Sequence, residues 1–180
     1  MSSAFSPTIK FRSGTPADAL CVGVLATQVF LDTYATEGIR SDLAREALAV
    51  YSPAVFSERL AHPSTFFILA EHCGHLLGFA ELMLGTQCPN ASISGGAELV
   101  RLYIQRPFKR KGLGSSLLAQ AERLAAERSA VALWLTVWTG NVSALHFYTA
   151  QGYKDVGATS YVFEDNAYEN RILTKTLFSS

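Results

Sequence analysis

The stretch PFKRKGLGSSLL, residues 107–118, places three cations directly before two spaced glycines and then becomes apolar. These cations and glycines are Lys109, Arg110, Lys111, Gly112 and Gly114. The apolar residues that follow recur at the spacing of one helix face, which predicts an α-helix from about Gly112 onward. Unpaired amides point out of the start of a helix, where the macrodipole is positive, and glycines let an anion approach them. The stretch is therefore either a solvated turn or a cradle for a phosphate group.

Two common phosphate-binding motifs do not fit these glycines. A Walker P-loop needs Gly-Lys-Ser/Thr, but Gly114 is followed by Ser115. A dinucleotide fingerprint needs a third Gly or Ala three residues beyond Gly114, and that position is Leu117. By itself, the glycine pair is equally typical of an ordinary strand-to-helix turn.

The composition of the whole chain indicates a globular protein without a broad electrostatic field. Its 180 residues are 49% hydrophobic and 17% charged, and the formal net charge is zero. We therefore expect no nucleic-acid or membrane partner, and any anion has to be bound by a local cluster. The three cysteines lack the spacing of a disulfide framework or a metal site, so we expect no bound metal. Without a signal peptide or an apolar run of about 18 residues, the expected location is the cytoplasm.

Strand and helix signals alternate along the chain, and no linker or repeat interrupts them. Thr15 is a plausible N-cap for the first helix, with Pro16 and Asp18 in its first turn. The expected helices cover about 16–34, 41–62 with a break near Pro53, 112 onward, and 143–151 up to Gly152. The expected strands are 9–12, 65–72, 75–84, 97–104, 131–138, 154–163 and 171–178. This order predicts one α/β (or α+β) domain over residues 1–180.

Two segments at the right separation resemble the GNAT superfamily of N-acetyltransferases. Residues 107–118 resemble its acyl-CoA pyrophosphate loop, Gln/Arg-x-x-Gly-x-Gly/Ala, with Lys109 in place of the usual Gln or Arg. NVSALHFYTAQGYKDVG, residues 141–157, resembles its Asn-x-x-Ala-x-x-Phe-Tyr-x-x-x-Gly-Phe/Tyr segment. A lysine presents charge to phosphate, but it lacks the planar fork of arginine. The resemblance implies the GNAT fold, a central mixed, mostly antiparallel sheet with a splayed strand pair and flanking helices.

The resemblance also implies acetyl-CoA as cosubstrate, bound by two parts of the chain. Backbone amides of the basic loop would hold the pyrophosphate of coenzyme A at the helix start. That loop comprises Lys109, Arg110, Lys111, Gly112, Leu113, Gly114 and Ser115. The pantetheine arm would pair with the strand at Leu102, Tyr103 and Ile104, in the gap between this strand and residues 131–138.

Direct acetyl transfer to an amine requires a general acid that protonates the leaving thiolate, and Tyr148 is the candidate. It matches the tyrosine that serves this role in many GNAT enzymes, which also places it beside the cofactor. Alternatively, Tyr148 only packs one face of a short helix. Asn141 matches the asparagine that contacts pantetheine in the family, and it is equally an N-cap for the helix that follows.

Glu98 is the candidate general base, acting through water. Strict alternation places it on the same strand face as the apolar Val100, Leu102 and Ile104, where its pKa would be raised. A β-bulge in the strand would change this face assignment. The alternative is a strand-end carboxylate that is solvated or paired with a basic neighbour.

The acceptor is the part of the reaction that the sequence defines least. From Glu98 onward the chain resembles small-molecule amine acetyltransferases, including polyamine-type members, which implies a primary amine acceptor. Acidic residues Glu164, Asp165 and Glu169 could attract a cation, although a solvated loop explains them equally well. Protein N-termini or lysines, amino acids and aminoglycosides stay open as acceptors, as does a non-catalytic acyl-CoA-binding module. Homodimers are common in the family, but the sequence locates no interface.

Overall fold

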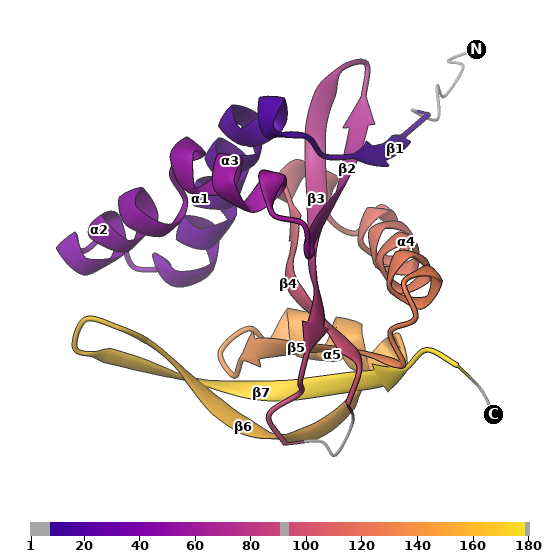
Figure 1. Ribbon diagram of the computed structural model, residues 1–180. Helices are drawn as coiled ribbons and strands as arrows, with labels where there is room; N and C mark the ends of the chain where they lie inside the picture. Colours follow the sequence, from indigo (N-terminus) through magenta and orange to yellow (C-terminus); the bar gives the residue numbers. More distant parts are fainter. Residues whose placement is uncertain (1–7, 91–93, 179–180) are drawn as a thin grey trace, which may run out of the picture.

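The computed structural model describes residues 8–90 and 94–178, and its helices and strands follow the predicted order (Figure 1). The strands are β1 (Lys10–Ser13), β2 (Thr65–His72), β3 (His75–Thr86), β4 (Gly96–Ile104), β5 (Ala132–Trp138), β6 (Lys154–Phe163) and β7 (Asn166–Thr176). The helices are α1 (Ala19–Tyr34), α2 (Ser41–Val50), α3 (Pro53–Ala61), α4 (Leu113–Glu127) and α5 (Val142–Ala150), with short 3₁₀ turns η1 (Pro16–Asp18) and η2 (Arg106–Phe108).

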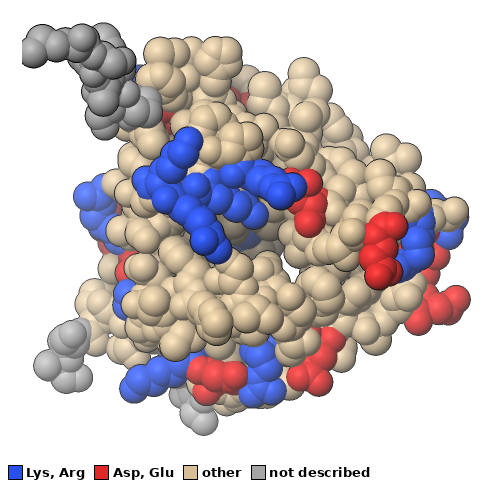
Figure 2. All heavy atoms as spheres, turned by 180° about the vertical axis from the view of Figure 1, so that it is seen from behind, with Lys and Arg blue, Asp and Glu red and all other residues tan. Residues whose placement is uncertain are grey.

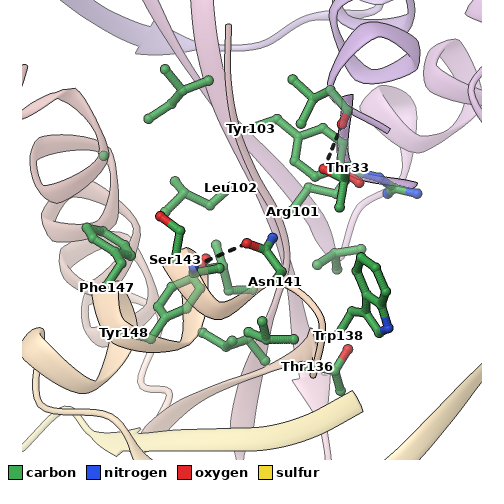
Figure 3. Close-up of a pocket in the computed structure, with 18 of the residues that line it drawn as sticks. Thr33, Arg101, Leu102, Tyr103, Thr136, Trp138, Asn141, Ser143, Phe147 and Tyr148 are labelled. Carbon is green, nitrogen blue, oxygen red and sulfur yellow. Dashed lines mark hydrogen bonds between the residues drawn. The ribbon is translucent and has the colours of Figure 1, made fainter. Parts of the chain in front are cut away.

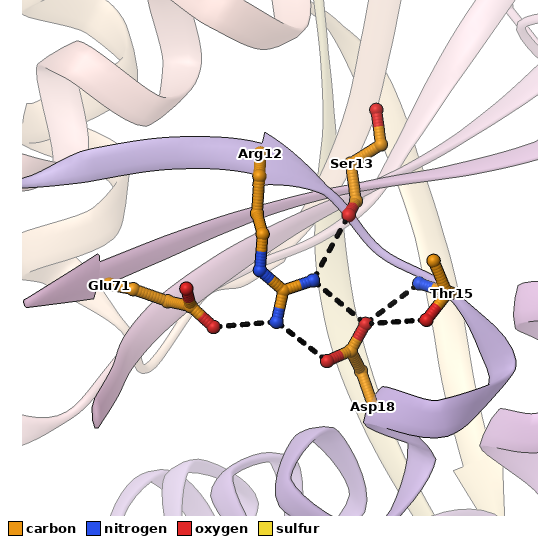
Figure 4. A network of polar contacts seen from close by, with 5 residues as sticks. All are labelled: Arg12, Ser13, Thr15, Asp18 and Glu71. Carbon is orange, nitrogen blue, oxygen red and sulfur yellow. Dashed lines mark hydrogen bonds and ion pairs between the residues drawn. The ribbon is translucent and has the colours of Figure 1, made fainter. Parts of the chain in front are cut away.

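Polar side chains fix the start of the first helix in the way that the sequence predicts. Thr15 and Asp18 form a capping box around η1, and Asp18 accepts a hydrogen bond from the Thr15 amide at 2.8 Å. Arg12 of β1 binds both Asp18, at 2.7 Å, and Glu71 of β2, at 2.6 Å (Figure 4). The hydrogen bonds from Arg12 lower the pKa of Asp18 to about 2. Strands β1 and β2 are thereby tied to the segment that leads into α1.

Proline and glycine end the helices where predicted. Pro53 is the first residue of α3, and Ser52 caps that helix through the Val55 amide. Gly152 follows α5 with a φ of +88°, which is the left-handed conformation that glycine favours. The start of β7 differs from the prediction, because the strand begins at Asn166 and not at Arg171. Its first residues pair with β6 in a protruding hairpin, where backbone hydrogen bonds do not require an apolar pattern.

The seven strands form one sheet in the order β1-β2-β3-β4-β5-β7-β6. Neighbouring strands are antiparallel except β4 and β5, which are parallel and pair only at Ala97 with Leu133 and Glu98 with Trp134. Beyond these pairs β4 and β5 diverge (Figure 1). Helices α1 and α3 pack on one face of the sheet, and α4 packs on the other. The mixed sheet, its splayed strand pair and its flanking helices confirm the predicted fold class.

A β-bulge in β4 lies just where the two strands begin to diverge. Glu81 of β3 is opposite Arg101, but the next residue, Leu82, is opposite Leu99. Val100 therefore has no partner in β3, and the strand face changes at this residue.

The bulge overturns the predicted face of Glu98. Beyond it, Leu102 and Ile104 pack in the core beneath α4, whereas Tyr103 packs in the core beneath α1 and α3. The Arg101 guanidinium likewise lies on the α1 and α3 side, over aromatic rings of that core. Ala97 and Leu99 pack in the core beneath α4, so Glu98 between them points to the α1 and α3 side, and the expectation that it shares a face with Leu102 and Ile104 is wrong.

Candidate active site

A cavity of about 860 Å³ opens where β4 and β5 diverge (Figure 3). Its walls come from residues 99–104 of β4 and 135–138 of β5, together with α5 and the loop before α4. Residues of α1, α2 and β6 line its other end. The cavity thus connects the two segments that the sequence analysis singled out with helices far away in the sequence.

The basic loop forms the first end of the cavity. This end is lined by Lys109, Arg110, Gly112 and Ser115. Figure 2 shows Lys and Arg side chains gathered around a hollow in the face opposite to that of Figure 1. Arg110 and Gly112 have φ angles of +60° and +79°, and Gly112 is the N-cap of α4. Alternating left-handed residues turn successive amides toward one point, which suits an anion. The sequence did not reveal the left-handed Arg110, because no glycine marks that position.

The two glycines of the loop serve different purposes. A side chain at Gly112 would meet no atom within 4 Å, so this position needs glycine only for its backbone angle. At Gly114 the φ angle is ordinary, but a Cβ would lie 3.4 Å from Ile104 Cδ1 and 3.5 Å from Phe147 Cζ. Gly114 therefore allows β4 and α5 to approach the start of α4 closely.

Two of the predicted loop residues do not line the cavity. The Lys111 ammonium lies over the Phe108 ring, 5.8 Å from its centre. Leu113 is 2% exposed and belongs to the core beneath α4. Leu113 could contribute only its backbone to an anion site, whereas a contribution from the exposed Lys111 side chain stays a prediction.

Tyr148 of α5 lies in the wall of the cavity, opposite Tyr103 and Thr33 (Figure 3). Its ring packs against Phe147 and Tyr153, with centroids 5.0 and 5.6 Å away, and it is 8% exposed. Among the described residues its hydroxyl has no hydrogen-bond partner. Burial raises the pKa of Tyr148 far above its usual value, so the phenol keeps its proton.

Asn141 lines the cavity next to Tyr148 and caps α5. Its Oδ1 atom accepts a hydrogen bond from the Ala144 amide at 3.2 Å, which confirms the predicted N-cap. Contact with the cosubstrate stays a prediction.

We expect Asn141→Ala to lower the free energy of unfolding by about 1 kcal/mol, the usual cost of losing an N-cap. Asn141→Ser restores an oxygen at the cap and should recover most of this stability. Urea unfolding of the three proteins checks the prediction, and equal stability of the alanine and serine variants would contradict it.

Glu98, the candidate base, is half-buried but is not among the residues that line the cavity. Burial, followed by the nearby Glu81 carboxylate, raises the pKa of Glu98, which agrees with the predicted direction. Its role as a base, reached through water, stays a prediction.

The acidic residues of the β6–β7 hairpin lie outside the cavity. Glu164 forms an exposed ion pair with Arg45 of α2, and neither Asp165 nor Glu169 lines the cavity. The cavity instead contains Glu46 of α2, whose carboxylate accepts a hydrogen bond from the Tyr161 hydroxyl at 2.5 Å. No local sequence signal marks Glu46, because only the tertiary fold brings α2 to this site.

Residues 8–90 and 94–178 contain no group of three or more His, Cys, Asp and Glu side chains that could hold a metal ion. No helix in the same ranges is long and apolar enough to cross a membrane.

Comparison with known proteins identifies the family. Residues 34–153 match the model of the acetyltransferase (GNAT) family. An uncharacterised N-acetyltransferase of Lactobacillus delbrueckii is 26% identical over 153 residues, which cover 85% of this chain and 88% of the relative. A spermidine N(1)-acetyltransferase of Thermoplasma acidophilum is 30% identical over 91 residues, which cover 49% of this chain and 52% of the relative.

Solved structures show the same fold. The PaiA N-acetyltransferase of Thermoplasma acidophilum in complex with coenzyme A has a TM-score of 0.76 at 23% identity, covering 94% of this chain and 99% of the other. The putative acetyltransferase yncA of Salmonella typhimurium, solved with acetyl-CoA, has a TM-score of 0.68 at 15% identity, covering 96% and 95%. The chain is therefore a member of the GNAT family of acetyl-CoA-dependent acetyltransferases.

Proposed function

We propose that this protein transfers an acetyl group from acetyl-CoA directly to a primary amine of a small, polyamine-like molecule. One observation carries the proposal. A single cavity joins the basic start of α4, the Tyr148 hydroxyl and a carboxylate, that of Glu46. An anionic cosubstrate fits the first end, and a cationic acceptor fits the second. The similarity to a spermidine acetyltransferase supports the same acceptor class.

The residues present suit acetyl-CoA. The amides between Lys109 and Ser115 would hold its pyrophosphate, with Lys109 and Arg110 adding positive charge. Beyond Glu98 the edge of β4 that faces β5 pairs with no strand of residues 8–90 and 94–178, so the backbone of Leu102, Tyr103 and Ile104 can pair with a ligand on that side. The amide-rich pantetheine arm would pair with this edge as an added strand does, beside Asn141.

The chemistry needs two proton transfers and no covalent enzyme intermediate. As the amine nitrogen bonds to the thioester carbon, the carbon–sulfur bond breaks and Tyr148 donates its proton to the leaving sulfur. The amine proton leaves through water toward a base, for which Glu98 is the candidate. Because burial raises the pKa of Tyr148, its phenol is protonated when acetyl-CoA binds and can hydrogen-bond to the sulfur as negative charge develops there.

The loop variant Gly112→Val tests whether this site binds acetyl-CoA. Valine is strained at a φ of +79°, so the amides around Lys111 should turn away and the affinity for acetyl-CoA should fall at least about tenfold. Gly74→Val in the β2–β3 turn is the matched control, because Gly74 has a φ of +76° and equally open surroundings. Calorimetric titration of the folded variants with acetyl-CoA measures the two affinities. The proposal would be contradicted if both valine variants bound acetyl-CoA with the affinity of the unaltered protein.

A further inference from the structure

The end of the cavity farthest from the basic loop in the fold contains one acidic side chain. Among the described residues that line the cavity, Glu46 is the only Asp or Glu. It comes from α2, and the rings around it come from three other elements. These rings are Tyr34 of α1, Trp138 of β5 and Tyr161 of β6. A single carboxylate among aromatic walls attracts a cation more strongly than it would in open water, because the walls lower the local dielectric constant.

The Arg101 guanidinium does not neutralise the Glu46 carboxylate, because Arg101 is already paired with Glu81. Arg101 also lines the cavity, and its Nη1 atom is 2.6 Å from Glu81 Oε2. Arg59 binds the other oxygen of Glu81, and the Glu98 carboxylate lies near both arginines. Two carboxylates therefore face these two guanidinium groups, and Glu46 is outside this network.

Glu46 is held in position by a tyrosine of β6. The Tyr161 hydroxyl donates to Oε1 at 2.5 Å, and no described residue donates a hydrogen bond to the other carboxylate oxygen, which is available to a ligand. The Tyr161 ring is itself fixed by the rings of Tyr34 and Phe163, whose centroids are 6.2 and 5.5 Å from its own. A carboxylate with one fixed hydrogen bond and a free oxygen is a ready acceptor for an ammonium group.

We propose that Glu46, positioned by Tyr161, binds a second cationic nitrogen of the acceptor. The acceptor is then a diamine or a longer polyamine, whose reacting amine is directed toward Tyr148 while its distal ammonium group pairs with Glu46. This assignment rests on the proposed function and goes further, because it states that the acceptor carries two amines and which residue recognises the second one.

Diaminobutane and butylamine test the assignment, since they differ only in the distal amine. The unaltered protein should acetylate diaminobutane with a kcat/KM at least about tenfold above that for butylamine, as expected for one partly buried ion pair. Glu46→Gln should remove this preference, mainly through a higher KM for diaminobutane. Tyr161→Phe should shift the same ratio in the same direction by a smaller factor.

Arg45→Gln is the matched control. Arg45 pairs with Glu164 at 2.5 Å and so also connects α2 to the hairpin, but it lies outside the cavity. An equal loss in Arg45→Gln and Glu46→Gln would assign the effect to the attachment of α2 and overturn the proposal. An equal loss of kcat for both amines in Glu46→Gln would make Glu46 a base and also overturn it. Acetylation of both amines by the unaltered protein without preference would overturn only this inference, whereas acetylation of neither would overturn the proposed function as well.

Discussion

Replacing Tyr148 by phenylalanine should lower kcat for amine acetylation by about 10²- to 10⁴-fold, the usual contribution of a general acid. The ring keeps its contacts with Phe147 and Tyr153, and the hydroxyl that is lost has no partner among the described residues. Stability and acetyl-CoA affinity should therefore change little. Steady-state release of coenzyme A thiol, measured with saturating amine, gives the ratio of kcat values.

Tyr153→Phe is the control for this experiment. Tyr153 is a buried tyrosine of the same segment, but its hydroxyl donates to Glu122 at 3.1 Å and does not face the cavity. We expect it to lose stability and to keep kcat. The pH profile adds a second check, because the raised pKa of Tyr148 keeps the acid protonated at neutral pH. No loss of kcat attributable to Tyr148 should appear as the pH rises from 7 toward the ordinary tyrosine value of about 10. A Tyr148→Phe protein with unchanged kcat would show that the residue only packs the helix.

Glu81→Gln should be the most destabilising of the substitutions considered, with a loss of about 3–5 kcal/mol in the free energy of unfolding. Glu81 is completely buried and pairs with both Arg59 and Arg101. Glutamine keeps the shape but removes the charge, which leaves two largely buried guanidinium groups insufficiently compensated. Urea or guanidinium unfolding followed by circular dichroism measures the loss.

The contrasting variant is Glu127→Gln, which removes an exposed pair. Arg123 and Glu127 lie one turn apart on α4 at 4.0 Å, with both side chains more than half exposed. Such pairs contribute about 0.5 kcal/mol or less. If Glu81→Gln were no more destabilising than Glu127→Gln, the buried network would not be the link between α3, β3 and β4 that its contacts indicate.

Local sequence signals were enough for most of the fold. The capping box at Thr15, the break at Pro53 and the glycine after α5 each act within a few residues, so the sequence locates them directly. The start of β7 was missed because the outer part of the hairpin relies on backbone pairing and has no apolar alternation. The predicted strand face of Glu98 was wrong for a similar reason. The bulge at Val100 arises from the register between β3 and β4. The sequence of β4 alone does not determine that register.

The candidate site divides in the same way. Residues that act through their own segment, such as Gly112 at the helix start and Asn141 at the cap, were predicted from short patterns. Glu46 and Tyr161 are far apart in the sequence and meet only because the fold brings side chains of α2 to the β6–β7 hairpin. Their neighbours in the sequence give no hint of this contact, so only the structure reveals this end of the cavity.

The central claim, acetyl transfer from acetyl-CoA to a small cationic amine, is tested most directly by one assay. Purified protein is mixed with acetyl-CoA and diaminobutane, thiol release is followed over time, and the amine product is identified by mass spectrometry. The account predicts thiol release that depends on both protein and amine, in step with the appearance of acetyl-diaminobutane. Thiol release that is the same with and without amine, or its complete absence from a folded protein that binds acetyl-CoA, would contradict it.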